Sequence, residues 1–185
     1  DYRDDIRLGD ETLQRLSDAY RRIRNTARYL LGNLAGFDPA RDMVADSELL
    51  ELDRWALSKL ARLVKKVETG YDKYEFHVIY HAVHNFCAVD LSAFYLDILK
   101  DRLYTSPKSS IGYRSARTSM YLILDAITRL LAPVLTFTAD EIWQEMPGER
   151  EESVHLAGFP KLMDQRLDAE LEARYEQLQK VRAEV

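Results

Sequence analysis

The chain has 185 residues, 46% of them hydrophobic, which is enough for one well-buried domain. It contains only seven glycines and five prolines, which favours helices over many short strands. The net charge of −5 does not exclude an anionic partner, because the excess of acidic side chains lies in the C-terminal part. Residues 140–185 hold 12 acidic and 6 basic side chains, whereas residues 1–139 hold 19 acidic and 20 basic side chains.

The first expected helix covers residues 10–34, and the polar residues 1–9 before it should form a connector. Apolar side chains recur along this helix at alternating spacings of three and four, which predicts one buried face. They are Leu13, Leu16, Tyr20, Ile23, Ala27, Leu30 and Leu34. Gly36 and Pro39 then predict the end of the helix and a loop.

Two further long helices follow. The second should start near Ser47 or Asp53 and stop near Gly70, with an inward face of Leu49, Leu52, Trp55, Ala56, Leu60, Leu63 and Val67. The third should cover about residues 73–103 and turn inward Phe76, Ile79, Val83, Phe86 and Phe94. Asp90 falls on that apolar arc, so its carboxylate needs a cation or a hydrogen-bond donor, which the sequence does not name.

A fourth helix should cover about residues 112–132, buried through Ala116, Met120, Ile123, Ile127, Leu130 and Leu131 and ended by Pro133. Thr138 and Glu141 have the spacing of a capping box, which predicts a short helix from Ala139, with Phe137 and Ile142 as a hydrophobic staple. After a loop-rich stretch, a last amphipathic helix should carry Leu167, Leu171, Tyr175, Leu178 and Val185 on one stripe.

These elements predict an all-α protein, an antiparallel bundle of four to five main helices. The connector is residues 1–9, the bundle is residues 10–146, and residues 147–185 form a loop and a C-terminal helical extension that leads to further structure. No apolar run reaches the length of a signal peptide or membrane span. A single cysteine, Cys87, excludes an internal disulfide and suits the cytoplasm. Without an initiator Met, the chain is expected to be part of a larger soluble protein.

One flank of the first helix is unusually basic. Arg21, Arg24, Asn25 and Arg28 fall within an arc of about 100° beside the apolar stripe. Asp18 is the only carboxylate between Arg15 and Leu34, and it can pair with only one of Arg21 and Arg22 at a time. Guanidinium groups grip phosphates and stack on bases, and an asparagine can read a base edge. The flank therefore points to RNA, against the simpler interpretation of a solvated helix face.

Several segments resemble the C-terminal helical domain of class I aminoacyl-tRNA synthetases, specifically the bacterial isoleucyl-tRNA synthetase family. They include DYRDDIRLGDE at 1–11, YRRIRNTARYLLGNL at 20–34, LDRWAL at 52–57, YHAVHNFCAVDLSAFYLDILKDRLY at 80–104, LLAPVLTFTADEIWQEMPG at 130–148 and ESVHLAGFP at 152–160. The resemblance covers nearly the whole chain in the family's order. It implies an anticodon-binding bundle that orients isoleucine tRNA, through its anticodon stem-loop, toward a catalytic domain elsewhere in the polypeptide.

In the related synthetases the first bundle helix and the end of the third approach the anticodon. The matching positions, and hence the expected tRNA-binding residues, are Arg21, Arg24, Asn25, Arg28, Lys100, Arg102 and Tyr104. The alternative for Lys100 and Arg102 is a surface pair with a carboxylate such as Asp97, and for Tyr104 it is packing at a helix end.

The family's HIGH and KMSKS-type signatures are absent from these residues, so we expect no catalytic residue here. The chain would belong to an enzyme that joins isoleucine to tRNA with ATP. ATP with magnesium, and zinc, would bind elsewhere in the full-length protein, and no cofactor is expected in this part.

Two other functions remain to be weighed. His77, His81, His84 and Cys87 recur along one helix, but successive turns advance about 5.4 Å, too far for one ion without ligands from another segment. Glu152 and His155 form a single Glu-x-x-His pair in the loop-rich stretch, whereas di-iron bundles use two. We therefore expect no metal site. A structural or protein-interaction bundle, or the bundle of a valyl, leucyl or methionyl synthetase, is the remaining alternative.

Overall fold

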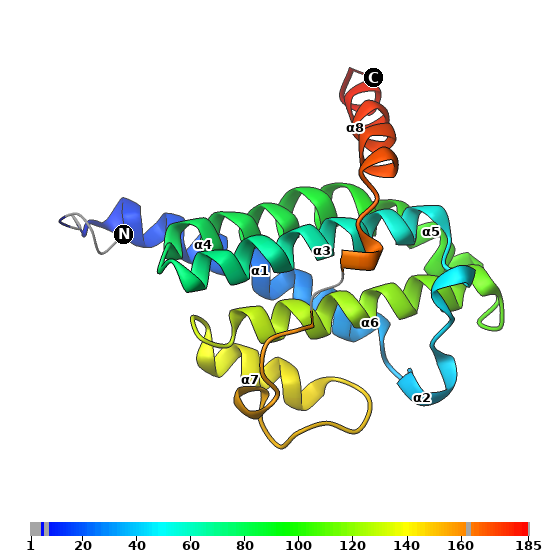
Figure 1. Cartoon of the computed structure of the whole chain (residues 1–185), viewed down its shortest axis with the longest axis horizontal. Helices are drawn as coiled ribbons and strands as arrows, with labels where there is room; N and C mark the ends of the chain where they lie inside the picture. Colours follow the sequence, from blue (N-terminus) through cyan, green and yellow to red (C-terminus); the bar gives the residue numbers. More distant parts are fainter. Residues whose placement is uncertain (1–4, 6–7, 162–163, 185) are drawn as a thin grey trace.

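Long helices make up the computed structural model, which describes residue 5, residues 8–161 and residues 164–184 (Figure 1). Those residues contain no strand, which confirms the all-α class. The main helices are α1 (Asp10–Asn33), α3 (Glu51–Asp72), α4 (Phe76–Asn85), η2 (Phe86–Tyr95), α5 (Leu96–Thr105), α6 (Ile111–Leu131), α7 (Thr136–Glu145) and α8 (Ala169–Glu184). Short turns of helix lie between them, namely α2 (Pro39–Asp42), η1 (Asp46–Glu48), η3 (Val154–Leu156) and η4 (Asp164–Arg166).

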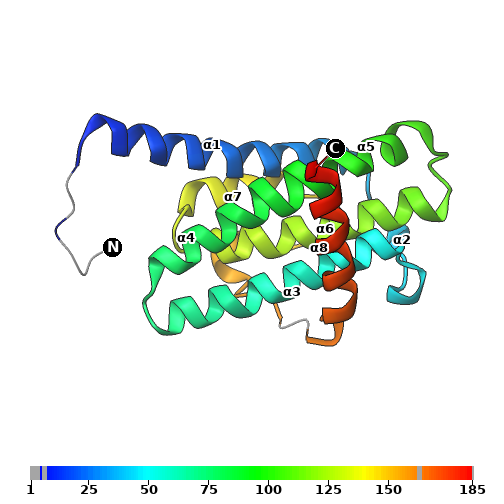
Figure 2. The ribbon, with the colours of Figure 1, turned by 90° about the horizontal axis from the view of Figure 1, so that it is seen from above.

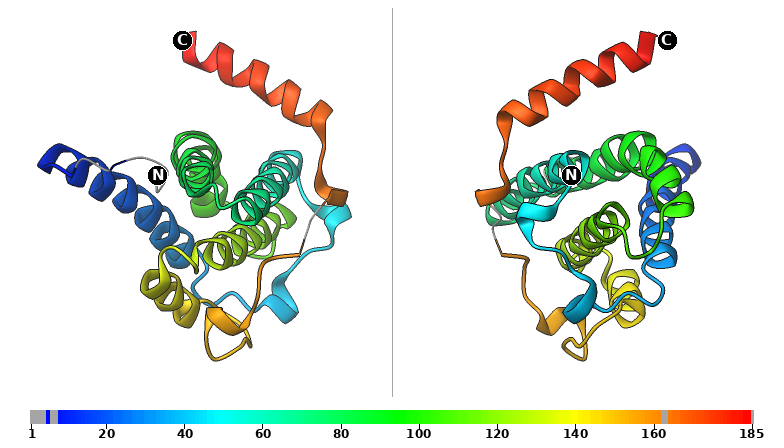
Figure 3. Two further views of the ribbon diagram at one scale, coloured as in Figure 1. Left: turned by 60° about the vertical axis from the view of Figure 1, so that its left-hand side comes forward. Right: turned by 90° about the vertical axis from the view of Figure 1, so that its right-hand side faces the viewer.

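Helix α6 is the centre of the bundle. It packs against α1, α3, α5 and α7, and the end-on views of Figure 3 show the other long helices arranged around it. The predicted inward residues of this helix are all buried, Met120 and Ile123 completely. The inward face predicted for α3 is also confirmed, from Leu49 to Val67. The sequence periodicity therefore locates the core correctly in the two best-buried helices.

The third expected helix is one helical run, α4–η2–α5, whose middle ten residues are π-helical. This run, residues 76–105, is antiparallel to α3 and is long and apolar enough to span a membrane by length and composition alone, so the prediction that no apolar run reaches that length is wrong. Half of its most apolar stretch is buried inside the bundle. Its composition is therefore explained by packing against α1, α3 and α6. Asp90 on this run meets Lys59 of α3, with 3.2 Å between Oδ1 and Nζ.

The apolar stripe of α1 is buried only in its second half. Ile23, Ala27, Leu30 and Leu34 are in the core, but the side chains before them are not: Leu13, Leu16 and Tyr20 are 49%, 50% and 38% exposed. Phe76, predicted to point inward, is 43% exposed. These predictions are wrong for this structure because the first turns of α1 project beyond the helices that would cover them (Figure 2).

The sequence signals predicted for the end of α1 and for the start of α7 can be compared with the structure. Gly36, with φ of +68°, follows α1 in the left-handed conformation that glycine adopts without strain, as its position predicts. The prediction that Thr138 and Glu141 form a capping box is wrong. Helix α7 starts earlier, at Thr136, so that Thr138 lies inside the helix and Leu135 is the N-cap residue. The Thr138 hydroxyl instead lies 3.0 Å from that of Tyr20, and Phe137 is 90% exposed, so no staple forms.

Helix α8 starts beside the middle of α3, where the Asp168 N–H donates to the Ser58 hydroxyl at 2.9 Å, and it crosses above the bundle (Figures 1 and 2). Its buried residues are Leu171, Glu172 and Tyr175, and the Tyr175 ring stacks on Trp55 with centroids 5.3 Å apart. The predicted stripe fails at Leu178, which is 57% exposed, and Val185 lies outside the described residues. Trp55 is confirmed as a core residue.

Candidate nucleic-acid interface

The basic flank of α1 faces solvent. The buried side chains of Ile23, Ala27 and Leu30 fix the rotation of the helix, and the flank lies beside them on the outer surface. Its exposed residues are Arg21, Arg24, Asn25 and Arg28. The structure therefore presents this part of the predicted site to a ligand outside the bundle.

Two of these arginines have no acidic partner among the residues that the structure describes. Arg21 pairs with Asp18 at 3.3 Å between guanidinium and carboxylate, as the spacing allows. Within the residues that the structure describes, no carboxylate lies within 4.0 Å of the guanidinium groups of Arg24 and Arg28. Their charges are neutralised only by solvent and counterions, which is the state that favours a phosphate contact.

A pocket joins the two predicted segments. It lies between α1 and the run η2–α5, has a volume of about 250 Å³, and has Asn25 on one side and Lys100 on the other. The remaining lining residues are Thr26, Tyr29, Ser92, Leu96 and Asp97. Thr26 and Ser92 hold the two helices together at its floor, with 3.1 Å between their hydroxyls. Residues 75 positions apart in sequence thus share one concave site.

Lys100 has the acidic partner that the alternative interpretation predicts. Its ammonium donates to Asp97 Oδ1 at 3.0 Å, and Arg182 of α8 donates to the other oxygen at 2.6 Å. Hydrogen bonds from Lys100 and Arg182 lower the pKa of the Asp97 carboxyl. One carboxylate thus faces two cations, so the rim of the pocket keeps an excess positive charge.

Tyr104 stands at the end of α5 and is 67% exposed. It lies beside the hydroxyl of Tyr29, whose pKa is raised well above its usual range by burial first and then by the Tyr104 hydroxyl. Tyr29 stays a neutral phenol next to the pocket, while the Tyr104 ring is free for stacking. An exposed aromatic ring beside cationic side chains is typical of sites for unpaired bases.

Arg102 differs from the other predicted residues because it faces the interior. Its Nη1 donates to Asp53 Oδ2 at 2.6 Å, and Asp53 is completely buried. The same carboxylate accepts hydrogen bonds from Tyr95, at 2.8 Å, and from Ser115. A buried carboxylate is costly unless it is paired and hydrogen-bonded, so Arg102 has a structural partner that the sequence did not reveal.

Comparison with known proteins connects this geometry to a family. A family model described as the anticodon-binding domain of tRNA ligase matches residues 53–185. The chain belongs to this family of anticodon-binding domains. It is 68% identical over 185 residues to the isoleucine–tRNA ligase of Syntrophotalea carbinolica, 55% over 185 residues to that of Geobacter sulfurreducens, and 53% over 184 residues to that of Moorella thermoacetica.

These alignments cover 100%, 100% and 98% of this chain, but only 20% of each relative. The chain therefore spans about a fifth of the length of these curated ligases. The family match starts at residue 53, within α3, whereas the alignment with the Syntrophotalea carbinolica ligase covers all 185 residues and so includes α1.

Two side chains of this anticodon-binding domain were missed by the sequence reasoning. Tyr29 follows Asn25 by four residues, so the same helical spacing that grouped the arginines could have placed it at the pocket. Arg182 had no such signal. It reaches Asp97 only because α8 folds back over α5, and its guanidinium lies 5.7 Å from the centre of the Phe94 ring.

The histidine series does not fit a metal site. In the part of the chain that the structure describes, no three His, Cys, Asp or Glu side chains converge as ligands. Tyr80 packs against His81 and His84, with ring centroids 5.0 and 6.0 Å away. Cys87 is completely buried, and burial raises the pKa of its thiol to about 12.

Proposed function

We propose that this domain binds the anticodon stem-loop of isoleucine tRNA as part of a cytoplasmic isoleucine–tRNA ligase. The observation that carries the proposal is the pocket between α1 and α5, which brings Asn25 and Lys100 together beside unpaired arginines. The names of the relatives supply the amino acid and the ligase activity. The domain contributes no catalytic group. Holding the anticodon end positions the acceptor end at a distant active site.

Each side chain of the site has its own role in the proposed complex. Arg24 and Arg28 hold phosphates of the loop, because their guanidinium groups are exposed and unpaired. The Asn25 amide, with both a donor and an acceptor, reads the edge of a base that enters the pocket, and Tyr104 stacks on a neighbouring base. Arg21 and Lys100 add charge at the rim, each shared with one carboxylate. Arg102 acts by fixing the end of α5 through Asp53.

Chemistry that needs a cofactor lies outside this domain in the proposal. ATP with magnesium, and zinc, are assigned to the other four fifths of the ligase, and the described residues contain no set of ligands that fits a metal. The main alternative, a purely structural bundle, predicts that tRNA affinity does not depend on the α1 flank.

The first prediction concerns Arg24 and Arg28. Changing both to Ala in the full-length ligase should weaken binding of isoleucine tRNA. The slope of log Kd against log salt concentration should become smaller by about 1–2, because each lost phosphate contact reduces that slope by roughly 0.7–0.9. ATP–pyrophosphate exchange without tRNA should be unchanged. Fluorescence titrations at several salt concentrations measure the slope.

Lys65→Ala is the matched control, since Lys65 is an exposed cation on α3, away from the pocket. Equal effects of the control and the double variant would point to general charge and contradict the proposed site. Replacing Asn25 by Ala adds a test of base reading. It should reduce the preference for the isoleucine anticodon over a changed anticodon, and a preference that stays unaltered would remove Asn25 from the proposal.

A further inference from the structure

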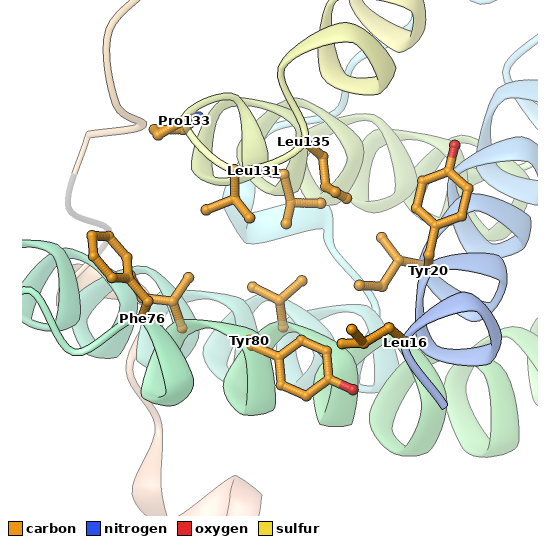
Figure 4. Close-up of a pocket in the computed structure, with 11 residues that line it drawn as sticks. Leu16, Tyr20, Phe76, Tyr80, Leu131, Pro133 and Leu135 are labelled. Atoms are coloured by element: carbon orange, nitrogen blue, oxygen red, sulfur yellow. The ribbon is translucent and has the colours of Figure 1, made fainter. Parts of the chain in front are cut away.

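Two concave sites involve α1, and they differ in charge. The larger is a groove of about 500 Å³ between α1, α4 and the turn that joins α6 to α7, and its lining residues that the structure describes include no charged side chain (Figure 4). The smaller is the pocket beside Asn25, which has Lys100 and Asp97 on its α5 side. Binding of a phosphate at the smaller pocket therefore depends on which cations compensate the Asp97 carboxylate.

Asp97 is shared by two cations from different helices. Its Oδ1 accepts a hydrogen bond from Lys100 at 3.0 Å, and its Oδ2 accepts one from Arg182 at 2.6 Å. Lys100 is three residues away on the same helix, whereas Arg182 is 85 residues away and reaches Asp97 only through the packing of α8. The three side chains are between 41% and 56% exposed, so either ion pair can open to solvent at little cost.

Arg182 has a second contact that holds it near Asp97. The centre of its guanidinium lies 5.7 Å from the centre of the Phe94 ring, which is within the range of a cation–π interaction. Phe94 also meets Tyr175 edge-on, with ring centroids 6.2 Å apart. Tyr175 precedes Arg182 by seven residues, so both project from nearly the same side of α8, which crosses above the bundle (Figure 2). The packing that docks α8 therefore also brings Arg182 to Asp97.

A phosphate that binds Lys100 has to compete with Asp97 for the ammonium group. If Lys100 were the only cation beside Asp97, its departure would leave an uncompensated carboxylate facing the phosphate, and the two negative charges would repel each other. With Arg182 on the second oxygen, Asp97 remains paired after Lys100 has turned away. One carboxylate and two cations also leave a net charge of +1 at this rim.

We propose that Arg182 is a positioning residue for tRNA binding, which holds Asp97 so that Lys100 is free to bind a phosphate of the tRNA. This role of Arg182 rests on the anticodon-binding function proposed above. It makes α8 a working part of the tRNA site, although α8 contributes no side chain to the lining of the pocket among the described residues. Docking of α8 on α3 and the charge of the pocket are thereby linked.

The test is the replacement of Arg182 by Gln in the full-length ligase. Binding of isoleucine tRNA should weaken several-fold, and the slope of log Kd against log salt concentration should become smaller by about 0.7–0.9, because Lys100 stays on Asp97 and one phosphate contact is lost. Arg182→Lys keeps the charge and should retain most of the affinity. Fluorescence titrations at several salt concentrations measure both quantities, and an unchanged affinity of Arg182→Gln would overturn the role of Arg182.

Lys180→Gln is the matched control. Lys180 is an exposed cation on the same helix, about 200° around the axis from Arg182, so its replacement removes the same charge from another side of α8. It should change neither the affinity nor the slope. An equal effect of Lys180→Gln and Arg182→Gln would reduce the role of Arg182 to general charge and overturn the proposal.

Asp97→Asn distinguishes a positioning role from the other roles that Arg182 could have. In the Asp97→Asn background, Arg182→Gln should have little further effect, because Lys100 has no carboxylate to which it can return. An equal loss of affinity in both backgrounds would mean that Arg182 touches tRNA directly or only holds α8 in place, and would overturn the proposal.

The double variant of Arg24→Ala and Arg28→Ala, measured in the same titrations, separates this proposal from the proposed function. If the double variant loses affinity and Arg182→Gln does not, the anticodon site stands and only the role of Arg182 is overturned. If neither loses affinity, the anticodon site itself is contradicted, and the role of Arg182 is overturned with it.

Discussion

Arg102 and Arg24 have the same side chain and opposite environments. Arg24 projects from α1 with no acidic partner in the described part of the chain, whereas Arg102 is held by Asp53, 49 residues earlier in the chain. The position of Arg102 near the end of α5 put it among the tRNA-binding candidates, but its charge compensates a carboxylate that has no contact with water. At the scale of a residue, charge alone does not separate a binding group from a structural one.

Arg102→Met should destabilise the isolated domain by about 3–5 kcal/mol, because it leaves the buried Asp53 carboxylate without a cation. Urea unfolding followed by circular dichroism measures the change. Lys100→Met is the matched control, and its effect on stability should be much smaller, since its partner Asp97 is solvated. Adding Asp53→Asn to Arg102→Met should recover part of the loss, and no recovery would contradict the pairing argument.

Helix α1 has three kinds of surface. It buries Ile23, Ala27 and Leu30 and exposes its arginines, while the apolar side chains of its first turns are also exposed. Helix α8 is held more lightly. Glu172 binds Ser58 and Arg62 of α3, and Tyr175 stacks on Trp55, but the helix beyond them is mostly exposed.

Tyr175→Ala should release α8 from the bundle without unfolding the rest. The ring stacks on Trp55 and meets Phe94 edge-on at 6.2 Å, and such aromatic pairs contribute about 0.5–1.5 kcal/mol each beyond their buried area. Hydrogen-exchange mass spectrometry should show faster exchange for residues 169–184 and little change in α3 and α6. Leu178→Ala, at an exposed position of the same helix, should have little effect. Equal acceleration in both variants would show that the stack does not hold α8.

The described residues form one continuous core, and Cys87 of the π-helical segment η2 lies inside it. Its thiol is completely buried, and burial raises its pKa to about 12. A raised thiol pKa means that the reactive thiolate is scarce at every pH below that value. Access for a reagent therefore requires the bundle to open.

Cys87 in the native domain should consequently resist iodoacetamide at pH 9, where an exposed thiol with a pKa of about 8.5 is mostly ionised. The same protein in concentrated urea should label at the rate of a free cysteine. Mass spectrometry over time gives both rates, and their ratio reports the free energy of opening, for which about 5–15 kcal/mol is the usual range for whole domains. Fast native labelling would place Cys87 outside the stable core.

The sequence by itself determined the class of fold, the core faces of α3 and α6 and the exposed arginine flank of α1. Apolar spacing fixes which face of a helix is buried, and the strings of residues shared with the synthetases fix the family. The predicted extents of the connector, the bundle and the C-terminal extension remain predictions.

Only the tertiary structure decided what covers each face. Periodicity predicted that Leu16 is buried, but it could not show that half of this side chain stays exposed. Pairings between distant residues, such as Asp53 with Arg102, Asp90 with Lys59 and Asp97 with Arg182, depend on how the helices pack. The pocket between Asn25 and Lys100 has the same origin, because a concave site is formed by two elements and neither sequence segment contains it alone.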